Sequence, residues 1–175
     1  MIGRGWGFLT VGAGMNHEIE FRSHVVAKQR GALERLVFFN SCQERVAAGI
    51  ADAVEMFGAP EIVADAPDRL RLSIARMPDA QCLLAVEKDT GKPVGVTVHI
   101  RPDLEHITVL HLSIAAEYAS GGIFADEHLL LRLLREVRQS TRRVKGVRRL
   151  ELYYGRSRAP RWRDEGAVFA SELAS

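Results

Sequence analysis

The chain has 175 residues, of which 47% are hydrophobic and 26% are charged, and its formal net charge is +2. This length and composition are typical of one globular domain, and the absence of any run of about 18 apolar residues excludes a membrane-spanning helix. Cys42 and Cys82 are too few for a disulfide scaffold, and no Cys or His pair has the spacing of metal ligands. We therefore expect a cytoplasmic protein without a metal site.

Glycine is frequent in the first 14 residues, MIGRGWGFLTVGAG. This stretch has neither the pattern of a signal peptide nor a dinucleotide-binding glycine motif. A globular pattern begins just after Met15, so we interpret residues 1–14 as an N-terminal extension, with Met15 as an alternative start. Residues 15–175 are predicted to form a single domain.

The first half of the chain is predicted to be mainly helical. Alternating polar and apolar residues predict a strand over His17–Arg22. Apolar residues three and four apart predict helix over Ala32–Phe57, with Ser41 as the N-cap of its second part. Pro67–Met77 is predicted as a further helix, because a proline occupies its first turn and its apolar residues share one face.

The second half is predicted to be richer in strands. Two strands flank the turn KDTGK, whose glycine favours a hairpin, and a third follows RPDLE. A glycine turn then leads into an amphipathic helix. The predicted elements are Gln81–Glu87, Pro93–Ile100, Glu105–Ala115, a helix over 124–143, Val147–Tyr154, a short helix over Arg158–Glu165 and a strand over Val168–Leu173. The order β-α-α-(α)-β-β-β-α-β-α-β predicts an α/β fold.

Gly121 and Gly122 lie in the turn between the third of these strands and the helix. The first N–H groups of a helix have no internal partner, and the helix dipole places positive charge there. Glycines let a phosphate come close to the backbone. The stretch therefore indicates an anion site, although steric needs alone also explain glycine in many such turns.

The order of elements from His17 to Phe169 resembles the GNAT superfamily of N-acetyltransferases. That resemblance implies a mixed central sheet of about six strands flanked by helices, with acetyl-CoA bound by one strand and the next helix. It assigns the aliphatic pair, the aromatic residue and the pyrophosphate turn to Leu112, Ile114, Tyr118, Gly121, Gly122, Ile123 and Phe124, with the Ile114 backbone meeting the thioester or pantetheine. The closing helix and strand of the family are similar to Ala159, Trp162, Gly166 and Phe169. This chain departs from the family pattern at three positions. Ala119 stands where the family has Arg or Gln, Ser120 stands where it has its next glycine, and the position of its general-acid Tyr falls near Arg163.

Acetyl transfer needs a base for the amine proton and is helped by an acid for the leaving thiolate. Period-two alternation predicts that Ile107, Val109, His111 and Ser113 share one strand face. The imidazole of His111 suits a base near neutral pH, and a packed histidine is the alternative; His99 is a second candidate base. Tyr154 is the candidate acid, with Tyr118 and Tyr153 as alternatives and packing roles open for all three.

Basic residues gather near the end of the chain. From Arg142 to Arg163, nine Lys or Arg residues stand against Glu151 alone, so this block carries +8 and the rest of the chain −6. Such a block indicates either a surface that meets anions or a solvated face. Arg142 and Arg143 are candidate contacts for the 3′-phosphate of the cofactor. Nucleic acid is an alternative partner, although the block lacks the interleaved aromatic residues that favour base stacking.

Three functions follow as hypotheses. The first is an N-acyltransferase that moves an acetyl group from acetyl-CoA to a small-molecule or protein amine. The second is a catalytically inactive GNAT-like structural or interaction protein, which Ala119 and Ser120 favour; the GAVF at Gly166–Phe169 resembles some internal virion proteins of short-tailed bacteriophages. The third is an adaptor for nucleic acid or an acidic partner through the Arg142–Arg163 block. The family resemblance also implies pairing of two copies through the last strand, as an alternative to a monomer.

Overall fold

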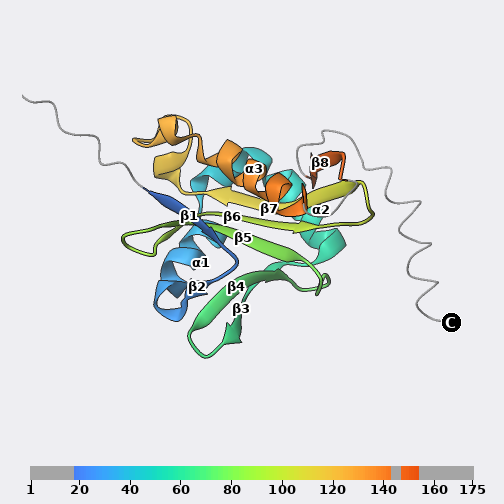
Figure 1. Ribbon diagram of the computed structural model, residues 1–175, viewed down its shortest axis with the longest axis horizontal. Helices are drawn as coiled ribbons and strands as arrows, with labels where there is room; N and C mark the ends of the chain where they lie inside the picture. Colours follow the sequence, from blue (N-terminus) through green and yellow to red (C-terminus); the bar gives the residue numbers. More distant parts are fainter. Residues whose placement is uncertain (1–17, 143–146, 154–175) are drawn as a thin grey trace, which may run out of the picture.

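The computed structural model describes residues 18–142 and 147–153, with the backbone alone for residues 45, 141 and 142. Two β-sheets form the framework (Figure 1). The larger sheet has five strands in the order β1-β5-β6-β7-β8, and the smaller has three in the order β2-β4-β3. The strands are β1 Ile19–Arg22, β2 Val25–Val26, β3 Pro60–Ala66, β4 Arg69–Ile74, β5 Gln81–Glu87, β6 Pro93–Ile100, β7 His106–Ile114 and β8 Arg149–Leu152.

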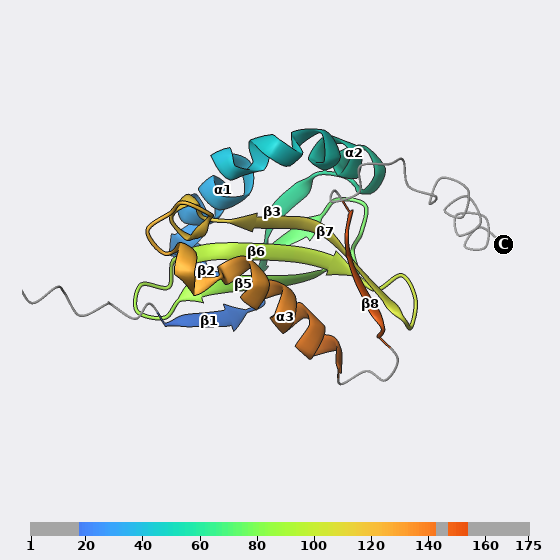
Figure 2. The ribbon, with the colours of Figure 1, turned by 90° about the horizontal axis from the view of Figure 1, so that it is seen from above.

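Helices cover both faces of the larger sheet (Figure 2). Helices α1 (Arg30–Phe38) and α2 (Ala47–Phe57) lie on one face, and α3 (Leu129–Arg142) lies on the other. Short 3-10 turns join these elements, namely η1 Ala27–Gln29, η2 Ser41–Val46, η3 Ala116–Tyr118 and η4 Ala125–Glu127.

The larger sheet separates two hydrophobic cores. On one face α1 buries Leu33, Leu36 and Val37 against β5 and β6, together with the apolar side of β4. On the other face Leu129 and Leu133 of α3 pack against Ala85 and Val109. Gly95 lets α3 approach β6, because a Cβ there would lie 2.7 Å from a Leu133 methyl group. The fold is thus a mixed α/β arrangement, as the sequence predicts at that level.

Strand β8 pairs with only the first half of β7. All neighbours in the larger sheet are antiparallel except this pair, in which Arg149–Leu152 lie parallel to His106–Val109. β7 continues to Ile114, whereas β8 ends at Leu152, opposite Val109. Within the described residues, the second half of β7 therefore has no strand partner on that side.

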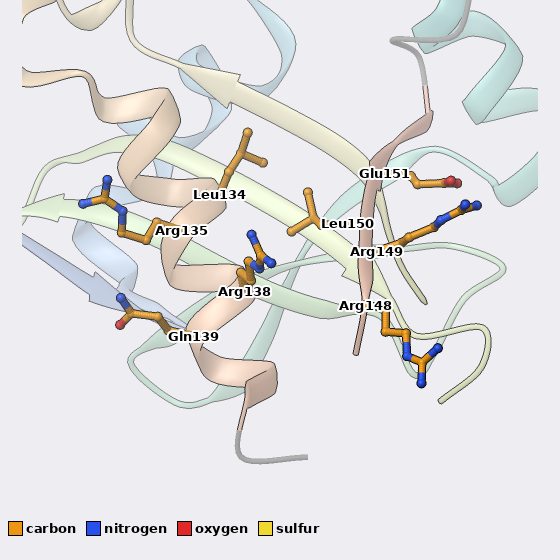
Figure 3. Close-up of a pocket in the computed structure, with 8 residues that line it drawn as sticks. All are labelled: Leu134, Arg135, Arg138, Gln139, Arg148, Arg149, Leu150 and Glu151. Atoms are coloured by element: carbon orange, nitrogen blue, oxygen red, sulfur yellow. The ribbon is translucent and has the colours of Figure 1, made fainter. Parts of the chain in front are cut away.

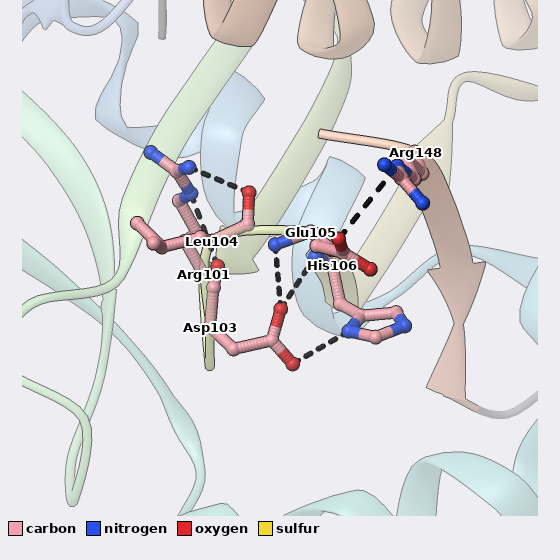
Figure 4. Close-up of polar contacts among 6 residues, drawn as sticks. All are labelled: Arg101, Asp103, Leu104, Glu105, His106 and Arg148. Carbon is pink, nitrogen blue, oxygen red and sulfur yellow. Dashed lines mark hydrogen bonds and ion pairs between the residues drawn. The ribbon is translucent and has the colours of Figure 1, made fainter. Parts of the chain in front are cut away.

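The turn between β6 and β7 holds the start of β8 in place (Figure 4). The N–H groups of Arg148 and Arg149 both donate to the Glu105 carbonyl, at 2.8 and 3.0 Å. One carboxylate oxygen of Asp103 accepts from the N–H groups of Glu105 and His106, at 2.7 and 2.8 Å. Slight burial raises the pKa of Asp103, but the hydrogen bonds from His106 and these amides outweigh it and lower the pKa overall.

The predicted strands Gln81–Glu87 and Pro93–Ile100 are confirmed with the same bounds, and β7 falls within the predicted Glu105–Ala115. The helix predicted over Pro67–Met77 is wrong, because that region belongs to the β3–β4 hairpin. Leu70, Leu72 and Ile74 are all buried at every second position, and this period of two is that of a strand.

Two helix boundaries also differ from the prediction. Asn40, rather than Ser41, caps the turn before α2: its side-chain oxygen accepts from the Cys42 N–H at 3.0 Å. Helix α3 begins at Leu129 instead of Phe124, after the η4 turn and after His128 with φ of 48°. The helix and strand predicted over Arg158–Glu165 and Val168–Leu173 lie outside the described residues.

Candidate functional site at the end of strand β7

The loop after β7 folds back on itself around Gly122. The Gly122 N–H donates to the Ala119 carbonyl at 2.8 Å, and the Phe124 N–H donates to the Glu117 carbonyl at 2.8 Å. A Cβ at Gly122 would lie 2.4 Å from the Glu117 carbonyl oxygen. Glycine is therefore required here by the close approach of the chain's own backbone. Two of the four amides assigned to a pyrophosphate already bind carbonyls of the loop.

The neighbouring Gly121 has a different environment. Its φ is 87°, and no atom lies within 4 Å of the place where a Cβ would stand. Ile123 is 83% exposed. The η4 turn separates Gly121 and Ile123 from Leu129, so these residues do not lie in the first turn of α3. The predicted continuity of strand, turn and helix is therefore not what the structure shows.

Tyr118 points into the protein rather than toward an open site. Its side chain is 2% exposed, its hydroxyl donates to the Glu87 carboxylate at 3.1 Å, and its ring lies 5.1 Å from that of Phe124. Burial, followed by the charge and hydrogen bond of Glu87, raises the pKa of Tyr118 far above its usual range. The aromatic residue assigned to the cofactor thus has a structural partner, and Glu87 was not anticipated as that partner.

Ile114 presents its backbone to the open side of β7. The Ala115 N–H donates to the Val94 carbonyl at 2.8 Å, so by the alternation of an antiparallel ladder the N–H and carbonyl of Ile114 point away from β6. The Ile114 carbonyl accepts from the Asn40 side-chain amide, which also donates to the Ser113 hydroxyl at 2.9 Å. The Ser113 hydroxyl donates in turn to the Leu36 carbonyl at 2.7 Å. Leu112, 9% exposed, packs in the core beneath α3.

A β-bulge in β7 overturns the strand face predicted for His111. The register with β6 shifts between Val98, which pairs with His111, and His99, which pairs with Val109. Val109 belongs to the core under α3, whereas Leu110 and His111 line a void of about 10 Å³ against α2. The predicted grouping of Ile107 and Val109 with His111 and Ser113 is therefore wrong, because the bulge inserts one residue into the alternation.

Both candidate bases are buried histidines. His111 and His99 are each 4% exposed, and burial lowers the pKa of each to about 4. Neither ring nitrogen of His99, nor the Nε2 atom of His111, has a hydrogen-bond partner among the described residues. An imidazole of this kind stays neutral at pH 7 and is a weak proton acceptor. Its surroundings are those of a packed core residue.

The remaining predicted site residues are only partly described. Tyr154 and Arg143 lie outside the described residues, as does the side chain of Arg142. Tyr153 packs edge-on against Phe57, with ring centroids 4.9 Å apart, and its hydroxyl contacts the Met56 sulfur at 3.5 Å.

A cavity of about 840 Å³ opens between α3 and β8. Sequence analysis did not anticipate it, since it depends on how far β8 stands from the helix. Four arginines and one glutamate are among its lining residues, which are Leu134, Arg135, Arg138, Gln139, Arg148, Arg149, Leu150 and Glu151 (Figure 3). Across the part of the chain that the structure describes, there is no cluster of side chains that could hold a metal ion and no helix long and apolar enough to cross a membrane.

Comparisons with family models, with curated proteins and with solved structures find no match to this chain.

Proposed function

We propose that this protein is an interaction module on a GNAT-like α/β scaffold, working through binding rather than acetyl transfer. The folding of the Ala115–Phe124 loop onto itself carries this proposal. Gly122 is packed against the carbonyls of Ala116 and Glu117, and its N–H is already bonded. A pyrophosphate would have to displace backbone hydrogen bonds that close the loop, and such groups are costly to leave unpaired.

The likeness to the GNAT scaffold rests on arrangement. An antiparallel run of strands leads into β7, α3 follows on one face, and β8 returns parallel to β7. The resemblance of the sequence from His17 to Phe169 supports the same scaffold. The burial of His111 and the internal bond of Tyr118 favour the non-catalytic form of it.

A second function, N-acylation of an amine by acetyl-CoA, is favoured by one specific observation. β8 pairs no further than Leu152, opposite Val109, so the outward-facing N–H of Ile114 is not covered by a described strand. A pantetheine arm pairs with backbone of this kind, which needs no particular side chain. In that case the burial of His111 favours another group as the acceptor of the amine proton.

Titration of the whole chain with acetyl-CoA separates the two functions. We expect no heat in a calorimeter and no change in melting temperature at millimolar ligand. A ligand present at 100 times its Kd would add about 2.7 kcal/mol to the free energy of unfolding, which a thermal melt detects readily. Coenzyme A without the acetyl group serves as the matched control ligand.

Saturable binding of acetyl-CoA, with thiol release in the presence of an amine, would overturn the first proposal and support the second. The pH dependence then tests the base. If His111 is the general base despite its burial, kcat/KM should fall only as the pH is lowered to about 4, because burial lowers the pKa of His111 to about that value. A fall of kcat/KM near pH 6.5 would indicate that another group is the general base.

A further inference from the structure

A second cavity, of about 220 Å³, opens between the last turns of α1, the start of β6 and the loop after β7. Leu36, Pro93 and Ala115 give it apolar walls, and Leu36 and Pro93 are buried. Sites that hold a whole cofactor or another small molecule usually measure about 300–1,000 Å³. At about 220 Å³ this cavity is small for such a molecule, but it is large enough for one apolar side chain of a polypeptide.

An exposed aromatic ring borders this cavity where α1 ends. Phe39 lines the cavity and is 79% exposed, and its neighbour Phe38 is 45% exposed. Aromatic side chains are enriched at protein interfaces, and those that contribute most to binding lie beside pockets that a partner fills. The Phe39 ring therefore offers apolar surface to a residue that adjoins the side chain in the cavity.

An arginine without a carboxylate partner also lines the cavity. Among the described residues Arg35 forms no ion pair, whereas Arg30 of the same helix pairs with Glu34 at 2.9 Å. The Nη1 atom of Arg35 lies 3.7 Å from the place where a Cβ of Gly31 would stand, so the guanidinium is turned back toward the start of α1. This direction takes it away from the carbonyl end of the helix, whose dipole repels anions. A carboxylate is therefore best placed on Arg35, one end of the cavity away from Phe39.

The other charges of the cavity wall neutralise each other. The Lys92 ammonium lies 2.6 Å from the Glu117 carboxylate, and both residues line the cavity. Arg35 is the remaining charged residue of the lining, so the described wall has one net positive charge. Complementary charge steers binding and suppresses unsuitable partners. The wall therefore favours an occupant with a carboxylate over a neutral or basic one.

We propose that this cavity docks an acidic segment of a partner protein, which inserts one apolar side chain, packs against Phe39 and places a carboxylate on Arg35. The inference rests on the proposed function as an interaction module and names its contact surface. Gly31, beside which the guanidinium lies, and Phe39 are eight residues apart, which is about 12 Å along a helix. An extended segment advances about 3.3 Å per residue, so the carboxylate and the residue on Phe39 should be about three or four positions apart.

Selection of random phage-displayed peptides on the immobilised full-length chain tests the docking. We expect enrichment of sequences with Asp or Glu about three or four positions from a large apolar residue, the spacing set by the strand rise. Phe39→Ser and Arg35→Glu should each raise the Kd of a synthetic peptide of the enriched sequence about tenfold or more, as the loss of a central contact does. Both side chains are exposed, so the melting temperature should stay the same.

Matched controls lie on α3, across the sheet from α1. Leu131→Ser and Arg135→Glu also change an exposed apolar residue and an exposed arginine, and they should leave the Kd of the peptide unchanged. Replacing the acid of the peptide with Lys should weaken binding to the wild type and improve binding to the Arg35→Glu variant. A peptide with this replacement that binds both proteins equally would overturn the contact with Arg35.

Other outcomes would reject the proposal in distinct ways. The absence of any enriched sequence, or a Kd that changes in the α3 variants and not in the α1 variants, would overturn docking at this cavity. Neither result decides the interaction function itself, which the acetyl-CoA titration tests separately. Hexanoate that binds as tightly as the peptide would identify a small carboxylate as the occupant. A dimer of the free protein that Phe39→Ser dissociates would identify a second copy of this chain instead.

Discussion

The hydroxyl of Tyr118 donates a 3.1 Å hydrogen bond to the carboxylate of Glu87. The Thr90 hydroxyl donates to the other carboxylate oxygen at 2.8 Å, and Glu87 is only 9% exposed. This network joins the loop after β7 to the β5–β6 hairpin. A nearly buried carboxylate needs such donors, because its charge is poorly solvated.

Changing Tyr118 to Phe should lower the free energy of unfolding by about 1.5–3 kcal/mol, the usual worth of a hydrogen bond to a charged group. The ring and its contact with Phe124 are retained, so the loss reports on the hydroxyl alone. Urea denaturation at pH 7 measures it. Unchanged stability together with weaker acetyl-CoA binding would contradict this role and restore Tyr118 as the cofactor contact that the sequence predicted.

The two glycines of the loop form a matched pair for a second prediction. At Gly122 a Cβ would lie 2.4 and 2.5 Å from two backbone carbonyl oxygens, whereas at Gly121 the space is open and only the φ of 87° is unfavourable. Gly121→Ala should cost about 1–2 kcal/mol, the penalty of a left-handed backbone. Gly122→Ala should cost about 3 kcal/mol or more, since backbone cannot give way cheaply. Equal costs, measured by thermal or urea unfolding, would show that the loop is not closed as described.

Much of the fold could be predicted because local signals and burial agree. The apolar run of β5, the alternating apolar residues of β6 and the glycine turn between them identify both strands with their bounds. The helix prediction for Pro67–Met77 was wrong because Leu70 and Ile74 fit the spacing of both a helix and a strand. Only the burial of Leu72 distinguishes the strand from the helix. That burial depends on β4 packing into the core that it shares with α1, β5 and β6, which no local pattern reveals.

The candidate site was harder to predict for a different reason. A bulge at Leu110 moves His111 to the α2 face, and bulges leave no reliable mark in a single sequence. Gly122 was correctly recognised as a place of close approach, but the approaching group is the Glu117 carbonyl from the same loop. The path of the backbone determines which group comes close to a glycine, and this path cannot be predicted from the residue types alone.

Asn40 should act as more than a cap. Its oxygen accepts from the Cys42 N–H, while its amide donates to Ser113 and Ile114 and so ties the end of α1 to β7. Aspartate is as good a cap as asparagine, but it has no donor for the Ile114 carbonyl. Asn40→Asp should therefore destabilise by about 1–3 kcal/mol, at least as much as Asn40→Ala. A neutral Asn40→Asp in chemical denaturation would reduce Asn40 to its capping role.

The buried histidines should make the fold sensitive to mild acid. Burial lowers the pKa of His99 and His111 from 6.5 to about 4. Between these values the unfolded chain binds protons that the folded protein does not, so the free energy of unfolding falls as the pH falls. The full stability is present above pH 6.5, and each histidine accounts for a loss of roughly 3 kcal/mol by about pH 4.

His99→Leu tests this directly, because a side chain of similar size replaces a ring whose two nitrogens have no partner among the described residues. At pH 7.5 the variant should be as stable as the wild type or more so, since no hydrogen bond is lost. Between pH 6.5 and 4.5 its stability, followed by urea denaturation, should fall about half as steeply. Adding His111→Leu should flatten most of the remaining slope. A wild-type slope in both variants would mean that the histidines are protonated in the folded protein, and a large loss at pH 7.5 would mean that the His99 nitrogens are hydrogen-bonded in solution.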